Sequence, residues 1–477
     1  MLRAPSPALL DSLASLLGPR GFTRDEQALA PWLNDWRGRY AGRAAALLSP
    51  ASAAQVQEIV TRCAQARAAL VPQGGNTSMV GGATPDVDGA ALLLSMRRMS
   101  AIRSVSAEDN VAVAEAGVIL SALHDAAAAA GRRFPLSLGA KGSATVGGLV
   151  STNAGGTQVL RFGPMRSLVL GLEAVLPDGS LIEGLSALRK DNRGYDLKQL
   201  LIGAEGTLGI VTAASLKLVA APGSRSVAWV GLASPAAALT LLRRLEGRLG
   251  DAVETFELVP ADALALVLAG IPGTRPPLAG SHRWHVLVES IAGEGARDAG
   301  EALQEALASA LEEGLADDAT VAASEAQAAA LWRLRESIAE AERLQGPSVK
   351  HDVSVPVSAM PAFIEDARAA VEARFEGARV VAFGHLGDGN VHFNVQPPAG
   401  EAAEAWLAAR AEAVTRLVHD LVGGTGGSIS AEHGIGQSKL AELARTADPA
   451  RLAALRAIKS ALDPAGIMNP GKLVPSV

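Results

Sequence analysis

Three glycine-rich segments in the first half of the chain constrain its fold more than any other feature. They cover residues 71–83, 137–156 and 203–210, and they contain few bulky side chains. Glycine permits left-handed backbone angles and close approach of a ligand, so successive N–H groups can converge on a phosphate. One such segment is either a structural loop or a phosphate site. Three of them favour a long ligand with a flat ring and a diphosphate, as in a large nucleotide cofactor.

The spacing of these glycines is neither that of a Walker A loop nor Gly-x-Gly-x-x-Gly, and no helical pattern follows the first segment directly. The sequence therefore argues against a Rossmann dinucleotide site.

The length of 477 residues predicts two or three domains. Residues 1–50 resemble a helical lead-in, and short strands alternate with helices from 51 to 219. A linker-like Ala-Ala-Pro-Gly-Ser follows at 220–224, and beyond it the pattern favours an antiparallel sheet covered by long helices. The expected fold class is α+β, with domains at 1–220 and 221–425 and a C-terminal segment at 426–477. The long helices are expected at 235–249, 296–314, 323–344, 358–375 and 401–421.

The charge pattern limits the kinds of partner that the protein can bind. A net charge of −6, from 43 dispersed basic and 49 acidic residues, makes nucleic acid or an anionic membrane an unsuitable partner. No uncharged apolar run reaches the roughly 18 residues of a membrane span. Cys63 is the only cysteine and lies in a helical pattern, so we expect a buried side chain and a reducing, cytoplasmic location.

Two histidine motifs near the C-terminus carry the candidate chemistry. Three of the eight histidines lie in Gly-His-Leu-Gly-Asp-Gly-Asn-Val-His-Phe-Asn at 384–394 and Ala-Glu-His-Gly-Ile-Gly at 431–436. A hairpin at Gly387–Asn390 would bring His385 and His392 to one side of a sheet. With Glu432 they would form a two-histidine, one-carboxylate site for a divalent metal, and the neighbouring His433 could accept a proton.

Together these motifs resemble a known family, the flavoproteins of the vanillyl-alcohol-oxidase (PCMH) type. Within it the chain is similar to the D-2-hydroxy acid dehydrogenases, a branch that includes the hydroxyglutarate, lactate and glycolate enzymes. The resemblance runs from about residue 30 to the end. Its markers are Pro-Gln-Gly-Gly-Asn-Thr at 72–77, Gly147-Gly148, 152–156, 191–197, 205–210, both histidine motifs and Asn-Pro-Gly-Lys at 469–472.

The resemblance implies non-covalent FAD held between two α+β subdomains, and a cap domain that contributes substrate-binding residues. The residues that it assigns to FAD are Gln73, Gly74, Gly75, Asn76, Thr77, Gly82, Gly139, Ser143, Gly147, Gly148, Thr152, Gly155, Gly156, Glu205, Gly206, Ile210 and Asn469.

The resemblance also implies roles at the histidine motifs. His385, His392 and Glu432 would bind a divalent metal, expected to be zinc, that coordinates the hydroxyl and carboxylate of the substrate. His433 would accept the hydroxyl proton while a hydride passes to the flavin.

Arg335 and Lys350 match cations that hold substrate carboxylate in the hydroxyglutarate enzymes, and Asn394 would be a hydrogen-bond partner. Two positions depart from the family pattern. Ala339 stands where a threonine is expected, which weakens the case for a distal carboxylate, and Arg193 also replaces a threonine.

The implied activity is oxidation of a small anionic D-2-hydroxy acid, with D-2-hydroxyglutarate first and D-lactate, D-malate or glycolate as alternatives. Electrons would leave to an electron-transfer flavoprotein or a quinone-linked chain. An oxygen-using oxidase and a non-catalytic flavin subunit remain as other classes. The oligomeric state stays open, with a homodimer as one option.

Overall fold

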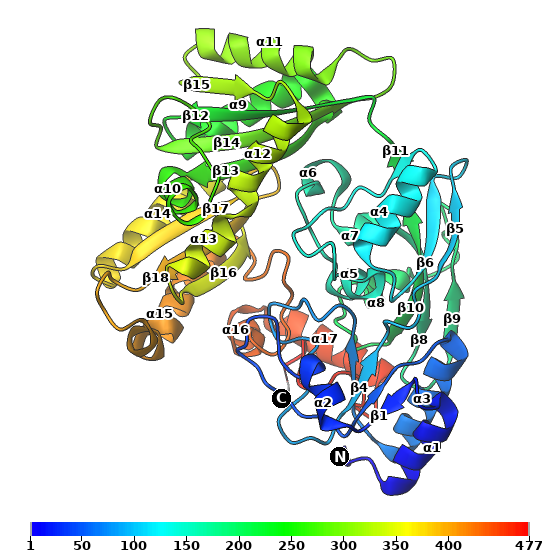
Figure 1. Ribbon diagram of the computed structural model, residues 1–477. Helices are drawn as coiled ribbons and strands as arrows, with labels where there is room; N and C mark the ends of the chain where they lie inside the picture. Colours follow the sequence, from blue (N-terminus) through cyan, green and yellow to red (C-terminus); the bar gives the residue numbers. More distant parts are fainter. Residues whose placement is uncertain (1, 476–477) are drawn as a thin grey trace. The chain divides into compact units, whose positions relative to one another are not determined.

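The structure, a computed structural model, describes residues 2–475 and divides the chain into two compact units. Unit 1 comprises the chain up to Gly156, Gly163–Ala221 and the segment from Glu432 onward (Figure 1). Unit 2 comprises Thr157–Phe162 and Pro222–Ala431. The sequence prediction had assigned residues 157–162 to the first domain. They belong to unit 2 because Thr255 Oγ1 donates a hydrogen bond to the carbonyl of Thr157 at 2.9 Å.

The first subdomain of unit 1 is built on a four-stranded sheet in the order β1-β2-β4-β3, in which β2, β4 and β3 are parallel. The predicted helical lead-in is partly wrong, because it contains two strands. Ala46–Leu48 is a continuous apolar run, and such a run fits a buried parallel strand as well as a helix. The elements are α1 Pro7–Leu17, β1 Phe22–Thr23, α2 Glu26–Leu29, η1 Ala30–Trp32, β2 Ala46–Leu48, α3 Ala53–Ala66, β3 Leu70–Gln73 and β4 Leu92–Ser95.

Cys63 on α3 is fully buried in the core of this subdomain, as expected. Burial raises the pKa of its thiol to about 12, so the thiolate that a nucleophile requires is not formed near neutral pH.

The second subdomain is a five-stranded antiparallel sheet in the order β5-β6-β10-β8-β9. Apolar and polar residues alternate at 108–118, the segment that contains β6, and Pro177-Asp178-Gly179 forms the turn between the paired strands β8 and β9. Its elements are β5 Ile102–Ser106, β6 Val111–Glu115, α4 Leu120–Ala129, β7 Arg132–Arg133, α5 Val146–Thr152, α7 Met165–Leu168, β8 Val169–Val175, β9 Leu181–Gly184, α8 Lys198–Leu201, β10 Ile210–Lys217 and β11 Val219–Ala220.

The last segment of the chain completes the first subdomain. After α16 (Leu440–Thr446) and α17 (Pro449–Leu462) the chain runs beside β3. Leu70 donates its N–H to the carbonyl of Ile467 at 2.8 Å and accepts from the N–H of Asn469 at 2.8 Å. Ile467 and Met468 are fully buried, so the tail is part of this core.

Unit 2 is a seven-stranded sheet in the order β15-β12-β14-β13-β17-β18-β16, with every neighbouring pair antiparallel (Figure 1). Helices cover both faces, which confirms the predicted architecture. The elements are α6 Val159–Phe162, β12 Ser224–Leu232, α9 Pro235–Leu249, η2 Gly250–Ala252, β13 Val253–Pro260, α10 Ala261–Gly270, β14 Trp284–Ala292, α11 Ala299–Glu312, β15 Asp318–Val321, α12 Glu325–Glu336, α13 Ile338–Leu344, β16 Val349–Ser354, α14 Met360–Arg374, β17 Arg379–His385, β18 Asn390–Gln396 and α15 Ala403–Gly424.

The two faces of this sheet have different cores. One face packs against α9, α11, α14 and α15, with residues such as Phe256 and Phe393 in the interior. The opposite face packs against α10, α12 and α13, around Trp229 and Phe383. The helix predicted at 323–344 is interrupted at Ser337, where α12 ends and α13 begins. Among residues 2–475, no helix is long and apolar enough to span a bilayer.

The α11 interface provides a test of this packing. Leu303→Ala removes a fully buried side chain from the core and should lower the free energy of unfolding by about 2–5 kcal/mol. Urea unfolding followed by tryptophan fluorescence measures the change. The matched control is Leu311→Ala on the same helix, whose side chain is 37% exposed and should cost less than about 1 kcal/mol. Equal losses in both variants would contradict the assignment of the buried face.

Candidate functional site

The β17–β18 hairpin places the two motif histidines on one face of the unit 2 sheet. Cross-strand pairing joins His385 with Asn390 and Phe383 with His392, so the two imidazoles are diagonal neighbours. Their ring centroids are 5.5 Å apart and the ring planes are nearly perpendicular. The hairpin predicted from Gly-Asp-Gly-Asn is therefore confirmed.

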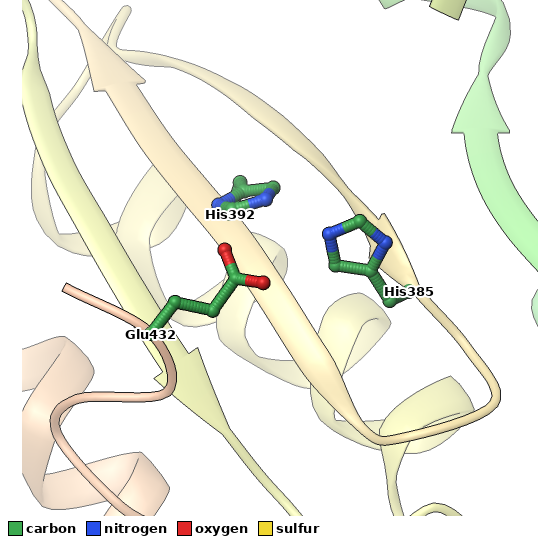
Figure 2. Close-up of side chains that lie close together, drawn as sticks. All are labelled: His385, His392 and Glu432. Atoms are coloured by element: carbon green, nitrogen blue, oxygen red, sulfur yellow. The ribbon is translucent and has the colours of Figure 1, made fainter. Parts of the chain in front are cut away.

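Glu432 completes a group of three ligands with these histidines. Each residue offers one ligand atom, and the three atoms lie within 4.8 Å of one another. Figure 2 shows the carboxylate directed toward the two imidazoles. Glu432 directly follows Ala431, the last residue of unit 2, whose N–H donates to the carbonyl of Asp352 on β16 at 3.3 Å. Zinc binds nitrogen and oxygen at about 2.0–2.2 Å, so small side-chain movements would let all three share one ion.

Glu257 on β13 is a member of this site that the sequence prediction missed. Its Oε1 lies 2.6 Å from Nδ1 of His385. Burial opposes ionisation of Glu257, but the charges of His385 and Arg335 hold its pKa below the usual range. A carboxylate on the outer nitrogen of a ligating histidine fixes the ring orientation and raises its basicity. The feature of the sequence that could have revealed it is an acidic residue between Phe256 and Leu258 in a predominantly apolar strand.

Arg335 of α12 is bound to the same carboxylate. Its Nε and Nη2 donate to Oε2 of Glu257 at 2.8 and 2.7 Å, and its guanidinium lies 4.9 Å from the ring centroid of Phe383. The side chain is buried. The guanidinium edge formed by Nε and Nη2 is thus used within the protein.

A second buried carboxylate joins the other two predicted substrate-binding residues. Oε2 of Glu342 on α13 accepts a hydrogen bond from Nδ2 of Asn394 at 2.7 Å and lies 3.9 Å from Nζ of Lys350. Burial raises the pKa of Glu342 to about 7, although Lys350 and Asn394 act in the opposite direction and Asp262 adds to the increase. Neither Glu257 nor Glu342 was among the predicted site residues, because each contact depends on tertiary structure.

His433 belongs to a second group of potential ligands, with Asp352 and Glu432, whose atoms also lie within 4.8 Å of one another. The backbone after His433 is fixed by Glu205, which was predicted to contact FAD. The Glu205 carboxylate accepts hydrogen bonds from the N–H groups of Ile435 and Gly436 at 2.7 and 2.8 Å. In the structure this side chain therefore anchors the His433 segment.

The glycine-rich segments of unit 1 form close backbone contacts where FAD was predicted. A Cβ at Gly75 would lie 2.1 Å from the carbonyl oxygen of Ser143, and one at Gly155 would lie 2.8 Å from Oε1 of Glu432. Each position therefore requires glycine, since Cβ atoms do not approach other atoms this closely.

Polar side chains beside these segments hold the loops and leave acceptors available. Nε2 of Gln73 donates to the carbonyls of Trp32 and Ala83, and Nδ2 of Asn469 donates to those of Gly82 and Glu205. Oε1 of Gln73 and Oδ1 of Asn469 are buried and accept no hydrogen bond from the described part of the chain. Buried acceptors of this kind suit a ligand that brings its own donors, as FAD does.

A cavity of about 460 Å³ adjoins the second glycine-rich segment, with Gly142 and Ser143 in its wall. Asn76 donates to the carbonyl of Asn34, and Thr152 donates to that of Gly148. Two departures from the family pattern lie on the surface. Ala339 is exposed, and Arg193 is exposed and pairs with Asp191; nothing in the structure explains Arg193.

Comparison with known families accounts for both units. Residues 44–184 match the FAD binding domain family, and residues 221–473 match the family described as FAD linked oxidases, C-terminal domain. The chain belongs to the FAD-linked oxidases. It is an FAD-dependent oxidoreductase with the PCMH-type fold.

Relatives in this family match over nearly the whole chain. A bovine protein named D-2-hydroxyglutarate dehydrogenase, mitochondrial, is 39% identical over 98% of this chain and 84% of its own length. A Xanthomonas citri protein named D-2-hydroxyglutarate dehydrogenase is 40% identical over 92% of this chain and 91% of its own. A putative D-lactate dehydrogenase of Schizosaccharomyces pombe is 36% identical over 92% and 84%. Because the bovine and yeast names are mitochondrial, the cytoplasmic location remains a prediction.

Solved structures share the fold at low identity. p-Cresol methylhydroxylase has a TM-score of 0.75 and 16% identity, covering 98% of this chain and 96% of that one. The 4-ethylphenol oxidase of Gulosibacter chungangensis has a TM-score of 0.74 and 18% identity, covering 100% and 99%.

Removal of the Glu257 carboxylate tests its role at His385. Glu257→Gln should weaken zinc binding by roughly 10–100-fold, because His385 loses the partner that orients its ring. Competition with a chromophoric chelator measures the affinity without any need for turnover. Glu254→Gln is the matched control, since Glu254 is a fully buried carboxylate on the same strand that pairs with Arg161. An equal loss of affinity in both variants would contradict a specific role for Glu257.

The pKa of Glu342 predicts how stability depends on pH. Its folded-state pKa rises from the ordinary 4.5 to about 7, so the unfolded chain releases this proton first. The contribution of Glu342 to stability is complete below pH 4.5 and is lost as pH rises through 7. Relative to Glu342→Gln, the wild type should lose roughly 3 kcal/mol between pH 4.5 and 8. Denaturant titrations of both proteins across this range measure the difference, and a constant difference would refute it.

Proposed function

We propose that this chain oxidises a D-2-hydroxy acid to the 2-oxo acid with FAD and a divalent metal ion, and that D-2-hydroxyglutarate is its substrate. The observation that carries the proposal is the convergence of His385, His392 and Glu432 in a protein of the FAD-linked oxidase family. The relatives named D-2-hydroxyglutarate dehydrogenase support this choice of acid.

The residues of the site divide the work of such an oxidation. Bound FAD would supply the two-electron acceptor, and bound zinc would lower the pKa of the substrate hydroxyl. His385, His392 and Glu432 would hold the ion, while Glu257 keeps Nε2 of His385 directed to it. His433 would take the hydroxyl proton on its imidazole, and Glu205 would keep the His433 segment in place.

Three polar residues would orient the acid. Lys350 and the Nη1 edge of Arg335 would attract carboxylate groups, and Asn394 would offer a hydrogen bond from its amide. Electrons would pass to an electron-transfer flavoprotein or a quinone-linked chain.

D-lactate is the second candidate. The yeast relative carries the name of a D-lactate dehydrogenase, and Ala339 offers no hydroxyl for a distal carboxylate. The two acids differ in this second carboxylate, so the residues around Lys350 should decide between them.

Anaerobic reduction of the flavin tests the proposed activity. The FAD-loaded protein should lose its absorbance near 450 nm when mixed with D-2-hydroxyglutarate, and the L enantiomer should have little effect. If none of D-2-hydroxyglutarate, D-lactate and D-malate bleaches the flavin, the proposed dehydrogenase activity is wrong. Steady peroxide formation in air would indicate an oxidase instead.

Removal of the metal tests whether the ion takes part in the oxidation. Treatment with a chelator should slow flavin reduction, and added zinc should restore the rate, because the ion would acidify the hydroxyl. If the measured metal content falls and the rate of flavin reduction does not change, the proposed role of the ion is wrong.

Substitution of His433 tests proton transfer. His433→Asn should lower the rate of flavin reduction by about 10²–10⁴-fold, because the variant lacks the imidazole that would accept the hydroxyl proton. Stopped-flow measurements across pH should also show that the variant loses the pKa of the base seen in the wild-type profile. A variant that keeps both rate and profile would exclude His433 as the base.

A further inference from the structure

Each cation predicted to bind substrate has a buried carboxylate partner within unit 2. Arg335 pairs with Glu257, and Lys350 lies near Glu342. The two pairs differ in closeness. The first contact is 2.7 Å with a second hydrogen bond at 2.8 Å, whereas the second is 3.9 Å. Glu342 therefore acts on Lys350 mainly through charge, without holding its ammonium group in a tight pair.

Glu342 is a charged residue in a buried position, which is energetically unfavourable. Its side chain is almost fully buried, with 1% exposure, and Oε1 accepts no hydrogen bond from any residue that the structure describes. A buried carboxylate with an unsatisfied oxygen destabilises a fold, and an apolar side chain of similar volume would avoid that cost. The Glu342 side chain accepts a hydrogen bond from Asn394, another predicted substrate-binding residue.

We propose that Glu342 determines how strongly the site discriminates between one and two carboxylates on the substrate. Its negative charge offsets that of Lys350 and repels a distal carboxylate, and its hydrogen bond positions the amide of Asn394. The chain thereby accepts monocarboxylic D-2-hydroxy acids better than a site with an uncompensated lysine would. This inference rests on the proposed function, since it concerns the substrate of the same site.

The test compares two substrates that differ in the distal group. For D-2-hydroxyglutarate and D-lactate, flavin reduction is measured at pH 8 in the wild type, Glu342→Gln and Glu342→Leu. The ratio of kcat/KM for the dicarboxylate to that for the monocarboxylate should rise roughly tenfold in both variants, mainly through KM for the dicarboxylate. Glu342→Asp keeps the charge and should keep a ratio near that of the wild type.

A matched control removes a charge from the same helix. Glu340 is exposed on α13, so Glu340→Gln removes one negative charge from the same helix at a solvent-exposed position. Its ratio should remain that of the wild type. A ratio that rises equally in this control would assign the effect to long-range charge and overturn the role of Glu342.

A change of pH supplies a readout that a purely structural role would not produce. The groups that face Glu342 are Lys350 from β16, Asn394 from β18 and Asp262 from α10, and Asp262 is paired with Arg368 at 2.7 Å. Since Glu342 titrates near pH 7, the wild type should approach the ratio of the variants at pH 6, while the ratio of Glu342→Gln stays constant.

If the variants reduce the flavin too slowly to measure, the binding of the two product acids can be measured instead. Perturbation of the flavin spectrum by 2-oxoglutarate and by pyruvate reports affinity for the two products, and the same change in ratio is expected. Unchanged ratios for both substrates and both products would overturn the inference and leave the proposed function intact. Failure of every D-2-hydroxy acid to reduce the wild-type flavin would overturn both.

Discussion

The buried carboxylate of Glu257 is the interaction on which the candidate site depends. One oxygen contacts His385 and the other contacts Arg335, so a potential metal ligand and a potential substrate cation share one anchor. A buried carboxylate is tolerated only where its partners compensate the loss of water. Here both partners come from elements that also form the sheet and its helical cover, β17 and α12. The packing of β17 and α12 in unit 2 therefore also determines how His385 and Arg335 are oriented.

The second buried carboxylate follows the same principle with less compensation. The Glu342 carboxylate accepts a hydrogen bond from Asn394 and has a more distant cation, and burial raises its pKa to about 7. Glu257 is held ionised by its neighbours, whereas Glu342 titrates close to neutral pH. The two glutamates thus give the face of one sheet both a fixed and a variable charge.

Much of this arrangement could be predicted from the sequence because it is local. The Gly-Asp-Gly-Asn turn predicted the hairpin that brings His385 and His392 together. Short apolar runs such as Ala46–Leu48 fit a strand or a helix equally well, so the pattern at 1–50 did not reveal β2. Glu257, Glu342 and the anchoring role of Glu205 could not be predicted, because each depends on contacts between residues far apart in the chain. The glycine pattern predicted the nucleotide cofactor of the family, but not which polar atoms would be left available for it.

The pairing of the chain's tail with β3 has a consequence for synthesis on the ribosome. The N–H and carbonyl of Leu70 bond to Ile467 and Asn469, and the tail side chains fill the core of the first subdomain. That subdomain cannot finish folding when its own strands emerge, because Ile467 and Met468 of its interior are translated after unit 2. Unit 2, apart from the short Thr157–Phe162 segment, is continuous in sequence and can form its sheet earlier. The core of the first subdomain can therefore be completed only after the sheet of unit 2 has been translated, in contrast to the usual order in which an N-terminal domain folds first.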